Sequence, residues 1–215
     1  TTLYTALSEL NRETVNIVTV EDPVEANIDG VNQIQVNPKA DMTFASALRS
    51  ILRQDPDIIM IGEIRDPETA EIAVQASITG HLVASTLHTN STSASIARLL
   101  NMGIEPYLMA DALVGVVAQR LVRKLCRCKR GREATAQEKE ELGVNQDEVL
   151  TIYEPAGCQL CSQTGYFGRT AVYEMMPVTP ELRWAITKMQ PSSKVKEIAQ
   201  REGMITLRGS AVRLV

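Results

Sequence analysis

The sequence predicts an α/β fold built on a mainly parallel sheet, followed by a smaller cysteine-rich part. Over the first half of the chain, short β-branched or apolar runs alternate with segments of helical periodicity. Acidic residues stand directly after two of these runs, and the four cysteines occur later as two close pairs. With 215 residues, of which 44% are hydrophobic, the chain can form one substantial domain and a smaller one.

Elements in the first half are predicted from apolar spacing and from residues that begin helices. Leucines three and four positions apart predict an opening helix, and Thr43 and Pro67 are residue types that begin helices. Residues 15–20 and 58–61 are unbroken runs typical of buried strands, whereas residues 31–36 alternate apolar residues with Asn and Gln. The predicted order is helix 3–11, strand 15–20, strand 31–36, helix 43–52, strand 58–61, helix 67–80, strand 82–86 and helix 95–102.

The pattern changes after Gln119 to cysteine pairs, basic residues and short strands, with a helix at 136–142 and helical spacing again from Thr179. We therefore expect an α/β core at 1–120, a cysteine-rich subdomain at 121–170 and a helical C-terminal region at 171–215. Both ends fall within helical patterns that lack start or stop residues. This pattern leads us to expect a fragment of a longer protein.

Charge and hydropathy exclude some classes of function. A net charge of −4 and a pI of 5.3 argue against nucleic acid as a direct partner. The sequence has no apolar run of membrane-spanning length and no signal peptide, so we expect a cytoplasmic protein. Residues 120–132 are locally basic and suit acidic partners or anionic lipid, or simply offset cysteine thiolates.

Acidic residues follow two predicted strands. Glu63 comes just after residues 58–61, and Glu21 and Glu25 follow the strand before it. Parallel strands bring such residues to one edge of a sheet, where carboxylates can organise Mg²⁺ or orient the water that attacks a γ-phosphate. The alternatives are a solvated Glu63 and a polar turn shaped by Pro23.

Basic residues and histidines complete the candidate site. Arg49 and Arg53 are four apart on a predicted helix, and arginine suits bidentate phosphate contact. His81 and His88 are the only histidines, and both lie in the segment GHLVASTLHTN. An imidazole near a phosphate can donate a hydrogen bond to it. The alternatives are a solvated basic stripe and structural histidines.

The four cysteines predict a metal site. Cys126-x-Cys128 and Cys158-x-x-Cys161 are two pairs in a chain expected to occupy a reducing compartment. Four thiolates in two pairs suit tetrahedral zinc, although the first pair has a short spacer. Four free thiols are the alternative.

Four segments in this order closely resemble one family: IVTVEDPVE, RQDPDIIMIGEIRD, GHLVASTLHTN and AQRLVRKLC. They are similar to the Asp box, Walker B motif, His box and entry to the zinc subdomain of type II secretion and type IV pilus assembly ATPases. The resemblance covers nearly the whole chain and implies a RecA-like P-loop NTPase core that binds ATP and Mg²⁺, with Zn²⁺ in the subdomain.

The resemblance also implies a role for each matching residue. The family's phosphate-binding loop, G-x-x-x-x-G-K-S/T, directly precedes a T-T-L-Y segment, so the loop would lie upstream of this chain. We therefore expect these 215 residues alone to hydrolyse ATP negligibly. The implied sites are Glu63, Glu21, His88, Arg49 and Arg53 in catalysis; Thr1, Thr2, Glu25 and His81 at the nucleotide; and Cys126, Cys128, Cys158 and Cys161 at zinc.

At the level of function, the resemblance implies a hexameric ring at the cytoplasmic face of the inner membrane. ATP hydrolysis would drive a membrane platform protein to assemble pseudopili or pili. Retraction motors of the family lack the cysteine pairs, so the cysteines favour assembly. The alternatives are a DNA-uptake pilus motor and a catalytically lapsed, zinc-containing adaptor on the same scaffold.

Overall fold

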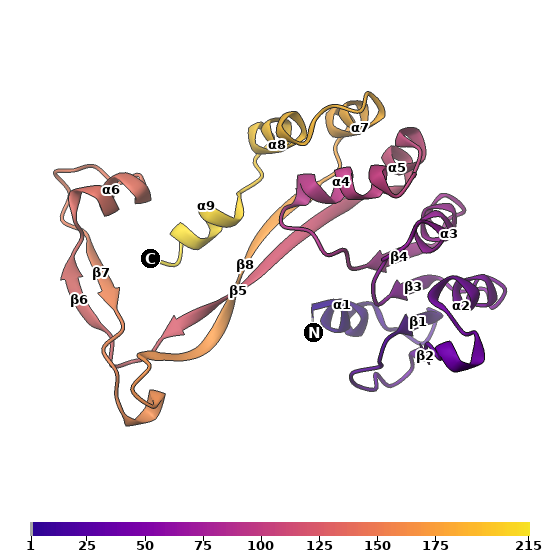
Figure 1. The fold of residues 1–215 in the computed structure, drawn as a ribbon, viewed down its shortest axis with the longest axis horizontal. Coiled ribbons are helices and arrows are strands. Elements are labelled where there is room, and N and C mark those ends of the chain that lie inside the picture. The colour runs from indigo at the N-terminus through magenta and orange to yellow at the C-terminus, as the bar shows by residue number, and fades with distance from the viewer. Residues whose placement is uncertain (1) are drawn as a thin grey trace. The chain divides into compact units, whose positions relative to one another are not determined.

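The computed structural model describes residues 2–215, which fall into two compact units. The first unit contains the chain up to Val116 together with Pro177–Ala199, and the second contains Val117–Met176 together with Gln200–Val215. Figure 1 shows the order of the elements along the chain. Within residues 2–215, no helix is both long and apolar enough to cross a membrane.

A four-stranded parallel sheet forms the centre of the first unit, in the strand order β2-β1-β3-β4. Its strands are β1 (Ile17–Glu21), β2 (Asn32–Gln35), β3 (Ile58–Ile61) and β4 (Leu82–Ser85). The predicted parallel α/β sheet is confirmed. Because all four strands run the same way, the residues that follow them meet at one edge of the sheet.

Side chains alternate between the two faces of this sheet. Ile17 and Met60 pack with Leu7 of helix α1 (Thr2–Leu10) in one buried cluster. Val20 and Ile61 have the opposite parity in their strands and are fully buried as well. Both faces of the sheet are therefore covered, which explains why β1 and β3 are unbroken apolar runs.

The helices of the first unit begin at the residue types that favour helix starts. Thr43 forms a reciprocal capping box with Ser46 at α2 (Phe44–Ile51), and Asp66 caps α3 (Pro67–Ile78). Ser91 caps α4 (Thr92–Asn101), so this helix begins three residues before the predicted start. The remaining helical elements are the 3-10 helix η1 (Pro38–Ala40), α5 (Pro106–Ala112), α7 (Pro180–Thr187) and α8 (Ser192–Arg201), which ends in the second unit.

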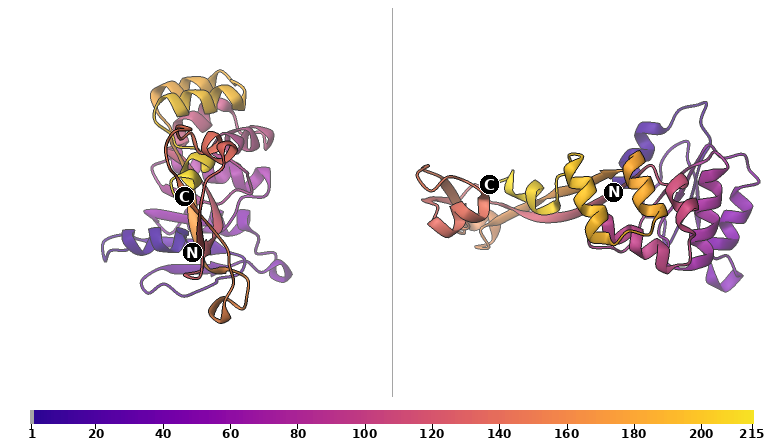
Figure 2. Two further views of the ribbon diagram at one scale, coloured as in Figure 1. Left: turned by 90° about the vertical axis from the view of Figure 1, so that its left-hand side faces the viewer. Right: turned by 90° about the horizontal axis from the view of Figure 1, so that it is seen from above.

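Two long strands, β5 (Gly115–Leu125) and β8 (Tyr166–Pro177), pair side by side and carry the chain between the units (Figure 2). Backbone bonds from Val178 to Val114 and from Cys126 to Gly165 show that the pair is antiparallel. The second unit also contains an antiparallel pair, β6 (Arg130–Glu133) with β7 (Thr151–Glu154). Its helical elements are α6 (Ala136–Leu142), the 3-10 helix η2 (Gln159–Cys161) and α9 (Leu207–Val212).

The two units do not follow the expected three parts. The boundary expected near residue 120 falls within β5, and residues 171–177, expected to be helical, form the end of β8. Arg120, Arg123 and Lys124 interrupt the apolar residues of β5 without a regular period, so the sequence did not show this strand. The division into three domains remains a prediction.

Candidate nucleotide site and cysteine cluster

Glu63 and His88 meet at the edge of the sheet where the strands end. Glu63 follows β3 by two residues, and His88 follows β4 by three. The Nε2 atom of His88 lies 3.0 Å from Oε2 of Glu63, and the Arg65 guanidinium donates to the same oxygen. The side chain of Glu63 is only 12% exposed, whereas that of His88 is 79% exposed. The structure thus brings these two predicted residues together.

The charge of Glu63 is set by two opposing effects. Burial disfavours the carboxylate, but hydrogen bonds from Arg65 and His88 outweigh it and lower the pKa of Glu63. The hydrogen bond to Glu63 in turn raises the pKa of Arg65, and the charge of Asp22 adds to this effect. Glu63 is therefore ionised at neutral pH. A carboxyl group has to be ionised to accept a proton or to orient a water molecule.

The backbone around Gly62 fixes the position of Glu63. The Gly62 N–H donates to the Val20 carbonyl at 2.8 Å, and the Thr86 hydroxyl donates to the Gly62 carbonyl at 2.7 Å. A Cβ atom on residue 62 would lie 3.3 Å from both the Glu21 Cα atom and the Val20 carbonyl oxygen. Glycine suits this position because β1 and the segment after β3 approach closely, and a larger residue would have to push them apart by a few tenths of an ångström.

Glu21 ends the neighbouring strand β1 and is 4% exposed. Its carboxylate accepts hydrogen bonds from Thr19 Oγ1 at 2.6 Å, from Gln33 Nε2 at 3.1 Å and from the Tyr4 hydroxyl. All three donors are uncharged. Glu21 thus lies one strand away from Glu63 and forms a buried hydrogen-bond network with α1 and β2.

Glu25 is exposed and lies in the loop that follows β1. Its backbone N–H donates to the Tyr4 hydroxyl at 3.0 Å. It helps to line a cleft of about 390 Å³, together with Tyr4, Thr5, Ser8, Ala26, Asn27 and Ile28. Of the predicted residues at the start of the chain, Thr2 begins α1 and Thr1 lies outside the described residues.

His81 lies at the other end of β4 from His88. It precedes the strand, and its Nδ1 atom is 3.0 Å from the Ala76 carbonyl and 3.3 Å from Thr79 Oγ1 at the end of α3. Because β4 is parallel to β3, His81 is at the edge opposite Glu63. The sheet therefore does not bring the two histidines together, contrary to the expectation from the shared segment.

The two arginines are also not neighbours on one helix. Arg49 lies in the last turn of α2 and forms an ion pair with Glu68 at 2.6 Å, in which both side chains are more than half exposed. Arg53 is exposed and lies beyond the end of α2, which is capped by Leu52. The expected shared helical face is therefore wrong, and the phosphate contacts of both residues remain predictions.

Sequence reasoning missed two residues that the structure places in this region. Arg65 donates to Glu63, and Tyr4 donates to Glu21. Arg65 is signalled only by its place two residues after Glu63. Tyr4 had no signal, because its partner is 17 residues away in the sequence.

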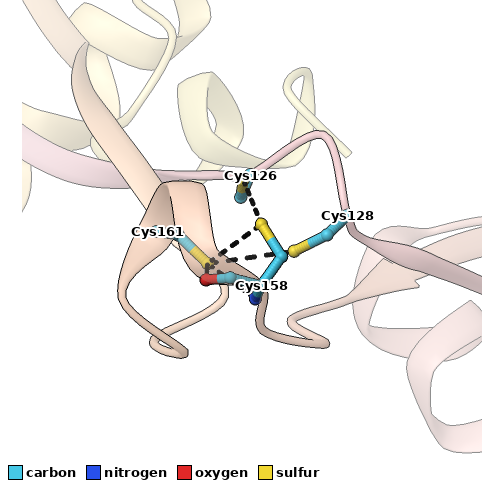
Figure 3. A group of neighbouring side chains, drawn as sticks. All are labelled: Cys126, Cys128, Cys158 and Cys161. Carbon is cyan, nitrogen blue, oxygen red and sulfur yellow. Dashed lines mark hydrogen bonds between the residues drawn. The ribbon is translucent and has the colours of Figure 1, made fainter.

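All four cysteines form one cluster in the second unit (Figure 3). Their sulfur atoms lie within 4.8 Å of one another, with separations of 3.9 Å for Cys126–Cys158, 3.9 Å for Cys128–Cys161 and 3.7 Å for Cys158–Cys161. A tetrahedral zinc ion with bonds of about 2.3 Å requires sulfur separations of about 3.8 Å. The four side chains thus fit zinc, and the short spacer between Cys126 and Cys128 does not keep them apart.

The cluster also contains donors that stabilise a thiolate. Burial works against charge on Cys161, but the N–H groups of Cys158 and Gly165, each 3.2 Å from Sγ, help lower its pKa to about 6. Burial raises the pKa of Cys128 to about 11, and contacts with the other three thiols add to this. A cation in the cluster would favour the charged form of all four sulfurs.

Comparisons with known proteins agree with this fold. Residues 1–215 match the family described as "Type II/IV secretion system protein". "Type II secretion system ATPase E" of Vibrio cholerae is 55% identical over 184 residues, which cover 85% of this chain and 37% of that protein. "Type IV pilus assembly ATPase PilB" of Myxococcus xanthus is 51% identical over 217 residues, which cover 99% of this chain and 38% of that protein.

Among solved structures, the pilus retraction motor PilT with bound ADP is similar, with a TM-score of 0.64 and 27% identity. The match covers 98% of this chain and 56% of the PilT chain. The first curated relatives are matched over only 37–44% of their own length. The parallel sheet with helices on its faces, together with the likeness to PilT, defines an α/β protein with a RecA-like fold. Within that class, the chain belongs to the type II/IV secretion system protein family.

Proposed function

We propose that this chain is the nucleotide-hydrolysing part of a motor that powers assembly of type II secretion pseudopili or type IV pili. The observation that carries the proposal is the contact between Glu63 and His88 at the carboxyl edge of the sheet. Relatives named as a type II secretion ATPase and a type IV pilus assembly ATPase, matched over most of this chain, support it.

In the proposed reaction, Glu63 orients the water that attacks the γ-phosphate and accepts its proton. Its lowered pKa keeps it ionised, and its low exposure limits competing solvent. Arg65 and His88 hold the carboxylate in one orientation. ATP would bring Mg²⁺, with Glu21 and Glu25 as the acids nearest to it and Arg49 and Arg53 as contacts for phosphate oxygens. Thr1, Thr2 and His81 are the remaining proposed nucleotide contacts.

The cysteine cluster would hold one structural zinc ion. Its four sulfur atoms fill a tetrahedral set of ligands, so no position remains for a reacting water. The presence of the cluster also favours assembly over retraction. We propose a homohexameric ring that acts on a platform protein at the cytoplasmic face of the inner membrane.

Replacing Glu63 with Gln in the complete protein that contains this chain tests the proposed function. Turnover of ATP should fall by at least about a hundredfold, because Gln retains the size of the side chain but cannot accept the proton. Glu71→Gln, which changes an exposed acid on α3, is the matched control and should keep its turnover. Unchanged turnover in Glu63→Gln would favour a different catalytic acid, and absence of ATP hydrolysis in the unaltered protein would favour the adaptor.

A further inference from the structure

The Tyr4 hydroxyl connects three segments of the first unit. Tyr4 lies in the first turn of α1 and donates to Oε2 of Glu21 at the end of β1. The Tyr4 hydroxyl oxygen also accepts a hydrogen bond from the backbone N–H of Glu25 at 3.0 Å. One phenol group thus binds a buried carboxylate and the loop that follows it.

The Glu21 carboxylate depends on this donor. It is nearly excluded from solvent, and its other hydrogen bonds come from Thr19 and Gln33, which are uncharged. A buried carboxylate with only neutral donors depends on each of them, because a buried acceptor that loses a hydrogen bond keeps the cost of its desolvation. Burial and the hydrogen bond to Glu21 raise the pKa of Tyr4, so its hydroxyl keeps the proton that it donates.

The loop after β1 is held differently on its two sides. On the β2 side, the Gln33 amide donates to the Ala26 carbonyl at 3.0 Å and accepts from the Ile28 N–H at 2.7 Å. On the α1 side, the cleft of about 390 Å³ separates residues 25–28 from Thr5 and Ser8. The Tyr4 hydroxyl therefore joins α1 to the loop at the margin of an open space.

We propose that Tyr4 is a positioning residue that fixes Glu21 and the loop of residues 22–28 relative to α1. This inference rests on the proposed function, in which Glu21 acts beside the nucleotide and α1 begins next to the phosphates. Tyr4 sets the position of the acid with respect to the start of the helix and makes no contact with the reacting atoms.

The first test is Tyr4→Phe in the complete protein. The ring stays packed near Leu7, and only the hydroxyl is lost. The kcat for ATP hydrolysis should fall about tenfold, the effect of losing one hydrogen bond to a charged group, while KM for ATP changes less than about twofold. Tyr107→Phe removes the same atom from an exposed ring on α5 and should leave both constants unchanged. If Tyr4 had a purely structural role, Tyr4→Phe would reduce the fraction of folded protein, and the folded molecules would keep a normal kcat and KM.

The second test is amide hydrogen exchange of the same proteins without nucleotide. Exchange in the peptide that contains residues 22–28 should accelerate in Tyr4→Phe, because the Glu25 N–H loses its acceptor, and should not change in Tyr107→Phe. A wild-type kcat or unchanged exchange in Tyr4→Phe overturns the proposal for Tyr4. If the unaltered complete protein hydrolyses no ATP, the proposed function fails instead, and the exchange measurement still reports whether Tyr4 holds the loop.

Discussion

The Nε2 atom of His88 and the Oε2 atom of Glu63 lie 3.0 Å apart although 25 residues separate them in the sequence. The contact arises because β3 and β4 are adjacent parallel strands, so the segments that follow them leave the sheet at the same edge. The Ile64 N–H bonds the Thr86 carbonyl at 3.0 Å and ties the two segments together.

Replacing His88 with Ala should lower ATP turnover of the complete protein by about tenfold to a hundredfold, because Glu63 loses one of its two side-chain donors. His81→Ala removes the same ring from the opposite edge; as a proposed nucleotide contact it should change KM for ATP, but turnover at saturating ATP should stay within about threefold of the unaltered protein. Steady-state ATPase assays at saturating ATP check this difference. Equal losses in the two variants would contradict the geometry described for β4.

Gly62→Ala should destabilise the protein by about 1–3 kcal/mol, because the added methyl group pushes β1 away from the segment that carries Glu63. Turnover per folded molecule should fall as well. Gly80 has a φ of +105° and open space around it. Gly80→Ala should therefore lower stability through backbone strain alone and leave turnover normal. Urea unfolding together with ATPase assays separates these effects, and normal turnover in Gly62→Ala would argue against a tightly fixed Glu63.

Elemental analysis of the purified protein should find about one zinc per chain. Cys161→Ser should reduce this content severalfold and lower the Tm, because metal binding stabilises only the folded cluster. Removing zinc with a chelator and then adding it back should restore the Tm of the unaltered protein but not of the variant. Zinc well below one per chain in the unaltered protein would leave the cluster as four thiols.

Stability of the second unit should depend on pH through Glu138. Arg132 donates to Oε1 of Glu138 at 2.6 Å and to Oε2 at 2.8 Å, and this pairing lowers the pKa of Glu138 to about 2. The folded pKa lies below the ordinary value of 4.5, so the stabilisation is present above pH 4.5 and is lost as pH falls toward 2. Glu138→Gln should therefore lower the Tm most near neutral pH.

Thermal unfolding of Glu138→Gln and of the unaltered protein at several pH values between 3 and 7 checks this dependence. Glu140→Gln, on the same helix, is the matched control and should behave like the unaltered protein. A Tm difference that grows as pH falls would show that the ion pair does not stabilise the folded state.

Much of the first unit was predictable because the signals are local. The strand at Ile58–Ile61 is an unbroken apolar run, and Thr43 and Pro67 mark the helix starts. Glu63 and His88 lie at one edge of the sheet because the strands that precede them are parallel, and a parallel sheet was predicted. The opposite placement of His81 was also present in the sequence, because a strand separates it from His88.

Other features depend on contacts between distant segments, which local patterns do not contain. β5 shows its strand character only through its pairing with β8, since basic residues interrupt its apolar spacing. Tyr4 reaches Glu21 across the face of the sheet, and no periodicity points to that hydrogen bond. The cysteine pairs predicted a metal site, but their convergence requires β5 and β8 to meet at Cys126 and Gly165.

The cysteine cluster brings together the two ends of a long insert in the chain. Cys126 and Cys158 are 32 residues apart, and β6, α6 and β7 all lie between the two pairs. A bound metal would join the two ends of this insert. If it behaves as a covalent cross-link does, the loop-closure entropy that it removes from the unfolded chain would stabilise the fold by roughly 3–4 kcal/mol. The insert could then lengthen, shorten or change its surface during evolution without disturbing the strands on which it is mounted.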